Sequence, residues 1–287
     1  MGSIVVGQTT HSIGPSRAWT DLGLGRGTEH MFPYVVVALF GAVIGSFLNV
    51  CIYRMPRAES VAWPASHCPV CRNSIAFYDN VPVLSYLILR GRCRACRTRI
   101  SSQYPIVEAA NAFGYVCLFW FFGFTAAACA YAVLLSALIV VTGTDLSHQI
   151  IPDVITLPGI IVGVLCALFI LPIGIVGALL GVVVGGGLLW FLAWISPYLF
   201  GKEGMGGGDI KMMAMVGAFI GWQPVLLAIM LGSLVGSIVG VGLIAAGLLR
   251  RDQYLPFGPF LAVGSLAALL FHEPLFAWYW SLIDIPR

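Results

Sequence analysis

The strongest constraint on this chain is a series of apolar stretches, each about as long as a bilayer is thick. A helix needs roughly 20 apolar residues to cross the hydrocarbon core of a membrane, and stretches of about that length recur from residue 31 to residue 278. Of the 287 residues, 59% are hydrophobic and only 9% are charged, which is too little charge for a water-soluble domain of this size. The sequence therefore predicts an all-α polytopic membrane protein.

We expect about eight transmembrane helices in this chain. The apolar windows place them at Met31–Ile52, Pro105–Phe124, Thr125–Thr144, Val154–Leu171, Ile173–Ile195, Ile210–Trp222, Val225–Leu249 and Phe257–Trp278. The sixth of these is short for a full crossing, and it can tilt or bend where its glycines loosen it. Residues 1–30 are polar and without periodicity, so we expect a flexible tail there, and they show no pattern of a removable signal peptide.

The long polar segment Tyr53–Tyr104, between the first two spans, contains two CxxC pairs. Cys68 and Cys71 form the first pair and Cys93 and Cys96 form the second, with 21 residues between the pairs. Four thiolates on two tight turns suit tetrahedral Zn²⁺ and leave no open coordination position, so the predicted site is structural.

Disulfide bonds are the alternative use of these four cysteines. They are disfavoured if the segment is cytoplasmic, because thiols stay reduced there. His67 is a possible alternate metal ligand, but four cysteines already complete a site. A polar segment this short and this poor in apolar residues needs such a metal to fold.

The basic residues indicate how the chain is oriented. The segment between the first two spans carries eight of the fifteen Lys and Arg residues, namely Arg54, Arg57, Arg72, Arg90, Arg92, Arg94, Arg97 and Arg99. By the positive-inside rule this segment is cytoplasmic, and with eight spans both chain termini lie outside. Arginines beside cysteines also occur in nucleic-acid-binding proteins, but a basic cytoplasmic loop is the simpler explanation, so we expect no nucleic-acid partner.

A glycine-rich stretch, Gly201–Lys211, precedes the sixth predicted span. Its five glycines disfavour a helix, since each costs about 1 kcal/mol relative to alanine, and they let the backbone turn and let another chain approach closely. Asp209 follows at the edge of an apolar run, where an ionisable side chain is costly and typical of a functional site. Capping the next helix is the alternative role for Asp209.

A second aspartate, Asp145, follows the third predicted span at the start of the connection Asp145–Asp153, and it lies at the same membrane face as Asp209. Two carboxyl groups held together at a dry boundary cannot both ionise easily, so one keeps a proton. Such a pair supplies a base for water and an acid for a leaving amide nitrogen, as an aspartyl protease requires. A mere pair of capping aspartates is the alternative. Asp153, after Pro152, is expected to cap the next helix, and His148 is expected to be a polar loop residue.

Several motifs resemble, in the expected order, those of the prepilin peptidases, which are membrane aspartyl proteases of type IV pilus and type II secretion systems. The glycine stretch with Asp209 resembles their glycine-x-glycine-aspartate motif, and the two CxxC pairs resemble their cytoplasmic zinc module. The other matching segments are Gly45–Val50 with Tyr53-Arg54, Arg90–Cys93, Tyr104-Pro105 with Glu108, Asp145 with Pro152-Asp153, and Pro256–Phe260. The resemblance covers about Phe40–Leu270.

The resemblance implies a catalytic pair, Asp145 and Asp209, with Gly206 and Gly208 allowing an extended substrate to approach Asp209. It divides the chain into the tail at 1–30, a first helix and four-cysteine module associated with methylation at 31–104, and a transmembrane aspartyl protease core at 105–287.

The activity implied by the resemblance is removal of a short basic leader from prepilins and pseudopilins at the cytoplasmic face of the bacterial inner membrane. Many members then methylate the new N-terminus with S-adenosylmethionine, and no glycine fingerprint or other cofactor pattern in this chain locates that donor. Ser147 stands where an acidic residue is frequent in the family. The implied partners are the prepilins and the lipid bilayer.

Two other classes of function stay open. A transporter can also hold paired carboxylates, but its site should lie near the membrane midplane between related halves, and no repeated halves are visible here. A zinc-dependent methyltransferase without protease activity would use the cysteine module and leave the glycine stretch unexplained.

Overall fold

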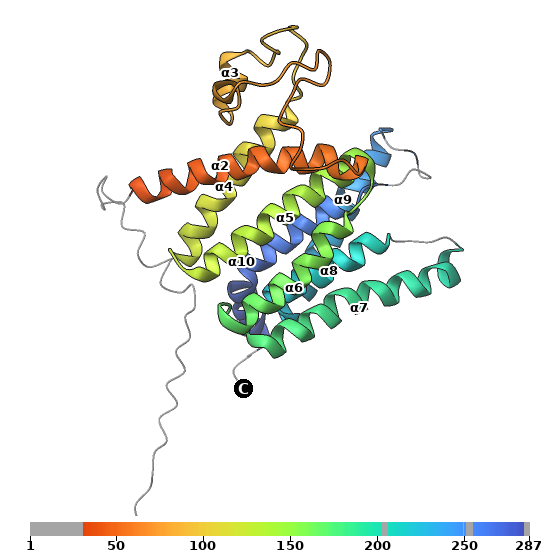
Figure 1. The fold of residues 1–287 in the computed structure, drawn as a ribbon. Helices are drawn as coiled ribbons and strands as arrows, with labels where there is room; N and C mark the ends of the chain where they lie inside the picture. Colours follow the sequence, from red (N-terminus) through yellow and green to blue (C-terminus); the bar gives the residue numbers. More distant parts are fainter. Residues whose placement is uncertain (1–30, 202–205, 249, 251–254, 284–287) are drawn as a thin grey trace, which may run out of the picture.

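The computed structural model describes residues 31–201, 206–248, 250 and 255–283, and the predicted tail at 1–30 lies outside them. In this part of the chain the long elements are all helices: α2 (Met31–Arg54), α4 (Gln103–Phe122), α5 (Ala126–His148), α6 (Asp153–Phe169), α7 (Gly174–Phe200), α8 (Gly207–Ile220), α9 (Trp222–Ala245) and α10 (Gly258–Ile283). Residues 55–102, with the short helix α3 (Leu84–Ile88), form a small module above α2 and α4 (Figure 1). The predicted all-α polytopic fold, with a cysteine module between the first two helices, is confirmed.

Helix α8 explains the one predicted span that looked too short. Within the described residues, α2, α4, α5, α7, α9 and α10 are long and apolar enough to cross a bilayer, whereas α6 has 17 residues and α8 has 14. Helix α8 contacts α5, α6, α7, α9 and α10, and every residue from Met212 to Ile220 is buried. Because protein rather than lipid surrounds α8, its length does not have to match the bilayer.

Small residues bring α8 against its neighbours. A Cβ atom added to Gly181 of α7 would collide with the carbonyl oxygen of Gly217 in α8, and the converse also holds. Only glycine allows two helix backbones to approach this closely, which is a common device for packing helices in membranes. The largest buried cluster then joins α8 to α5 and α10, through side chains such as Met213, Leu138 and Leu261.

The helix ends differ from the sequence-based boundaries by a few residues, and two of these differences concern the aspartates. Helix α5 continues to His148, so Asp145 lies in its last turn rather than in a connection. Helix α8 begins at Gly207, so two glycines expected to disfavour a helix form its first turn. Packing of the buried α8 outweighs their low helix propensity. Residues 202–205 of the glycine-rich stretch lie outside the described residues.

Candidate active site and metal centre

Asp145 is held at the end of α5 by contacts on its backbone and its side chain. The helix ends at the C-cap residue Gln149, whose backbone is in the left-handed conformation (φ 54°). The backbone N–H of Gln149 donates to the carbonyl oxygen of Asp145 at 2.8 Å. The side chain of Asp145 is buried, and its Oδ2 accepts a hydrogen bond of 2.9 Å from the backbone N–H of Gly258, the first residue of α10. One carboxylate oxygen therefore has a fixed donor from another helix.

Asp209 lies in the first turn of α8, close to Asp145. It is the third helical residue after the N-cap residue Gly206, which makes no side-chain cap, so the alternative role of Asp209 as the N-cap is excluded. The side chain is buried, and within the described chain its Oδ1 has no hydrogen-bond partner. The two carboxyl groups are near enough for the charge of Asp145 to act on Asp209. The structure thus brings together the two aspartates singled out in the sequence.

The two motif glycines differ in their surroundings. A Cβ atom on Gly208 would lie 2.7 Å from the Cβ atom of Ile151, so this glycine lets the start of α8 pack on the connection between α5 and α6. A Cβ atom on Gly206 would meet only Asp209 Oδ2, at 3.7 Å, which is an ordinary contact. Packing therefore accounts for Gly208, and substrate approach stays a prediction for both glycines.

The prediction that Asp153 caps α6 is wrong. The N-cap residue is Pro152, which offers no side-chain acceptor, and Asp153 is the first helical residue. Its carboxylate instead forms an ion pair with Lys211 of α8, with Nζ–Oδ distances of 2.7 and 2.8 Å. Since both side chains are exposed, this ion pair contributes only about 0–1 kcal/mol to stability.

His148, predicted to be a polar loop residue, is exposed but ends α5.

The four cysteines of the module converge as predicted. Their Sγ atoms all lie within 4.8 Å of one another, and Cys68 Sγ is 3.8 Å from Cys96 Sγ. This separation is close to the edge, about 3.8 Å, of a tetrahedron with Zn–S bonds of about 2.3 Å. All eight cysteines of the chain are free thiols, and His67 stays outside the cluster, with its Nδ1 3.0 Å from the carbonyl oxygen of Ala65.

The two CxxC turns share one backbone pattern. In the first turn, the backbone N–H of Cys68 donates to the carbonyl oxygen of Asn73 at 2.9 Å, and the carbonyl oxygen of Cys68 accepts from the N–H of Arg72 at 2.8 Å. In the second turn, Cys93 makes the same two bonds with Thr98 at 2.9 Å and with Arg97 at 3.0 Å. The backbone of both arginines adopts the left-handed conformation, with φ of 58° at Arg72 and 59° at Arg97. The backbone N–H of Cys71 lowers the pKa of the Cys68 thiol to about 6, which favours the thiolate that binds metal.

One ion pair ties the segment between the two turns to the second turn. Arg94 donates from Nε and Nη2 to the two carboxylate oxygens of Asp79, at 2.7 and 2.6 Å. This hydrogen bond and the arginine charge hold the pKa of Asp79 below its usual value. The pair therefore persists at neutral pH and is lost only as Asp79 becomes protonated in acid.

Gly258 is a contact of the site that the sequence analysis did not single out. Gly258 belongs to Pro256–Phe260, a segment noted only for its resemblance. Gly258 meets Asp145 across 113 residues of sequence. No short sequence pattern predicts a contact between residues so far apart in the chain.

Comparison with known proteins gives matches along most of the chain. A model described as the bacterial peptidase A24 N-terminal domain matches residues 39–122, and one described as the type IV leader peptidase family matches residues 132–241. Among curated relatives, each named "Prepilin leader peptidase/N-methyltransferase", the Pseudomonas putida protein is 35% identical over 90% of this chain and 96% of its own length. The Pseudomonas aeruginosa protein is 38% identical over 88% of this chain and 95% of its own length. The Aeromonas hydrophila protein is 36% identical over 90% of this chain and 97% of its own length. No solved structure gives a significant match.

Proposed function

The chain belongs to the type IV leader peptidase family, and from this membership we propose that it is a bifunctional prepilin leader peptidase and N-methyltransferase. It cleaves the leader from prepilins and pseudopilins and then methylates the new N-terminal amine. It is a multi-pass inner-membrane protein. The observation that supports the peptidase function most strongly is the meeting of buried Asp145 and Asp209, and Oδ1 of Asp209 has no partner among the described residues.

The aspartates provide both proton transfers that peptide hydrolysis needs. The ionised carboxyl group takes a proton from a water molecule as that water attacks the scissile carbonyl carbon, and the protonated one donates to the leaving amide nitrogen. Asp145 Oδ2 is already bonded to the N–H of Gly258, which fixes the orientation of that carboxyl group. Oδ1 of Asp209, which has no partner in the described part of the chain, would bind the water or share the proton. Burial keeps the pair away from bulk water, which strengthens these interactions.

The function is tested by mass measurement. Purified enzyme in liposomes is incubated with a prepilin and S-adenosylmethionine, and the substrate is weighed by mass spectrometry. We expect loss of the leader followed by a gain of one methyl group. A substrate that is methylated but not cleaved would contradict the peptidase function and support a methyltransferase without protease activity. A substrate of unchanged mass would contradict both activities and favour the transporter class.

The contact between α10 and Asp145 predicts the effect of a single methyl group. In Gly258→Ala the new Cβ atom would lie 2.8 Å from Asp145 Oδ2, so the carboxyl group has to move. A displacement of about 1 Å in a catalytic group can cost about 10²-fold in rate, and we expect a loss of that order in leader cleavage. Gly242→Ala in α9 is the control, because its Cβ atom would meet nothing within 4 Å and its backbone is helical. Equal rates for the two variants would contradict the positioning role of Gly258.

The metal of the module is zinc in this proposal. Four convergent thiols fit Zn²⁺ in number, donor type and spacing. With Cys68, Cys71, Cys93 and Cys96 as ligands the coordination sphere is full, so the ion supplies folding energy rather than catalysis.

The module and the aspartates face the cytoplasm, and both chain termini face the periplasm. This orientation rests on the arginines between the first two helices. Single cysteines at Ser16 and Ser281, in a background without other reactive thiols, should react with an impermeant reagent in intact cells. One at Ser60 should react only after the membrane is opened. The reverse labelling would place the aspartates in the wrong compartment for this substrate.

A further inference from the structure

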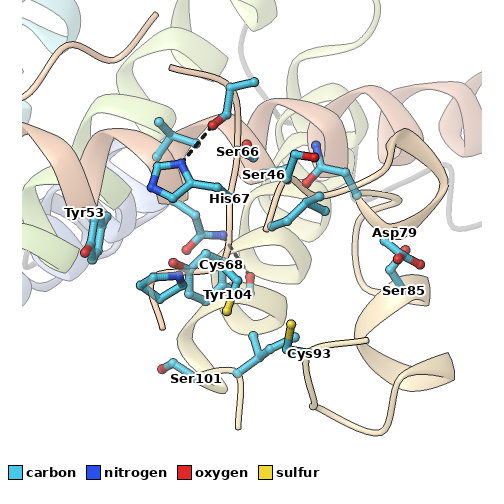
Figure 2. A pocket seen from close by; sticks show the side chains of 18 of the residues that line it. Ser46, Tyr53, Ser66, His67, Cys68, Asp79, Ser85, Cys93, Ser101 and Tyr104 are labelled. Carbon is cyan, nitrogen blue, oxygen red and sulfur yellow. Dashed lines mark hydrogen bonds between the residues drawn. The ribbon is translucent and has the colours of Figure 1, made fainter. Parts of the chain in front are cut away.

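A cavity of about 1510 Å³ lies between the four-cysteine module and the membrane helices. Its wall combines side chains from three helices with side chains of the module (Figure 2), such as Ser46 of α2, Tyr104 of α4 and Cys68. Ser147 and His148, from the last turn of α5, also line it. That turn also carries Asp145, two residues before Ser147, although Asp145 itself does not line the cavity.

Glu108 places a buried carboxylate in the wall of this cavity. Only 7% of the residue is exposed. Its Oε2 accepts a 2.7 Å hydrogen bond from the backbone N–H of Val83. Glu108 takes no part in the two ion pairs found among the described residues, Arg94–Asp79 and Lys211–Asp153. A buried negative charge without a cation is costly, and a cationic ligand would offset that cost.

Asn49 adds a second polar group that protein contacts leave incomplete. It is 2% exposed, and its Nδ2 donates to the carbonyl oxygens of Tyr104 (3.0 Å) and Gly45 (3.3 Å). Its Oδ1 is buried without a partner in the described chain. Gly45 allows this arrangement, because a Cβ atom there would lie 2.7 Å from the Cα atom of Glu108. The segment Gly45–Val50 carries part of the family resemblance, yet peptide cleavage makes no use of it.

We propose that this cavity binds S-adenosylmethionine, with Glu108 facing the positively charged sulfonium group and Asn49 Oδ1 accepting a hydrogen bond from one of the donor's amino groups. The assignment rests on the proposed methyltransferase function and gives that function a site. The cavity exceeds the roughly 300–1,000 Å³ of usual ligand sites, so it also admits the end of a peptide. The proposed cleavage at Asp145 would release the new N-terminus on the same helix turn as Ser147 and His148, which line the cavity.

The chemistry explains why a carboxylate suits this position. After losing one proton to water, the amine nitrogen bonds the methyl carbon, and the C–S bond breaks with its electron pair left on sulfur. The donor thereby changes from a sulfonium cation to S-adenosylhomocysteine, a neutral thioether. A carboxylate facing the sulfur favours the cation over the thioether, so the charge of Glu108 binds the donor and releases the spent product.

Binding of the two ligands to purified, zinc-loaded full-length enzyme tests this assignment. We expect Glu108→Gln to weaken S-adenosylmethionine binding at least tenfold and S-adenosylhomocysteine binding less than threefold, measured by equilibrium dialysis. Glu273→Gln is the matched control, because Glu273 is an exposed acid of α10 that does not line the cavity, and neither affinity should change more than twofold. An equal loss for both ligands, or no loss, would overturn the role of Glu108, as would an equal effect of Glu273→Gln.

A second measurement on the unmodified enzyme keeps the test decisive if Glu108→Gln loses zinc and misfolds. Ultraviolet irradiation of bound radiolabelled S-adenosylmethionine should attach label to peptides from 43–67 or 78–108, and attachment only elsewhere would overturn the site. An enzyme that methylates prepilin normally after Glu108→Gln would refute this inference alone. An enzyme that cleaves but neither binds the donor nor methylates would refute the proposed methyltransferase function itself.

Discussion

Changing either Asp145 or Asp209 to asparagine should abolish leader cleavage, lowering the rate by about 10⁴-fold. Asparagine keeps the size of the side chain and can still accept the hydrogen bond from Gly258, but it carries no titrating proton. Because the proposed mechanism uses the two carboxyl groups as one unit, the double variant should be hardly slower than either single one. Single-turnover cleavage of a prepilin in liposomes measures all three rates.

Asp153→Asn is the matched control for this experiment. It removes the same charge at the same membrane face, but from an exposed ion pair with Lys211 rather than from the buried pair. We expect its cleavage rate to stay within a few-fold of the unmodified enzyme. Turnover near normal for Asp145→Asn or Asp209→Asn, with membrane insertion verified, would rule out the aspartyl mechanism.

The helices could be predicted because lipid imposes a simple rule on sequence. Apolar stretches of bilayer length can satisfy their backbone groups only as helices, so eight helices were found with ends shifted by a few residues. The rule does not apply to α8, which contacts five other helices and is shorter than a bilayer requires. Its burial depends on contacts such as Gly181 with Gly217, which no single segment reveals.

The candidate site was predictable where a residue type conflicts with its surroundings. An aspartate beside an apolar run is costly, so Asp145 and Asp209 could be selected from sequence alone, and four cysteines in two turns specify their own geometry. The backbone N–H of Gly258 could not be found in this way, since any residue except proline carries that group. Glu108 was noted only as part of a resemblance, because its burial depends on how the module rests on α2 and α4.

Loss of zinc should unfold the module while the helices stay assembled. Between Met55 and Ser102 only Cys68 and Ser85 have buried side chains, so this part of the chain has almost no apolar core of its own. A structural zinc ion in a small domain contributes about 10 kcal/mol or more at neutral pH, which exceeds what so few buried groups can replace. We expect one zinc per chain, lost in Cys93→Ser, with residues 55–102 becoming sensitive to protease.

Measuring leader cleavage distinguishes a structural zinc ion from a catalytic zinc ion. Asp145 and Asp209 lie on α5 and α8, and neither helix contributes a ligand to the cysteine cluster. Enzyme molecules that survive as Cys93→Ser should therefore still cleave prepilin within a few-fold of the normal rate, although less protein will accumulate. Cys129→Ser, at an exposed thiol in α5, should keep both the metal and the yield. Protein without zinc whose module cysteines are joined as disulfides would contradict the metal site and, because such bonds form in oxidising compartments, the cytoplasmic orientation with it.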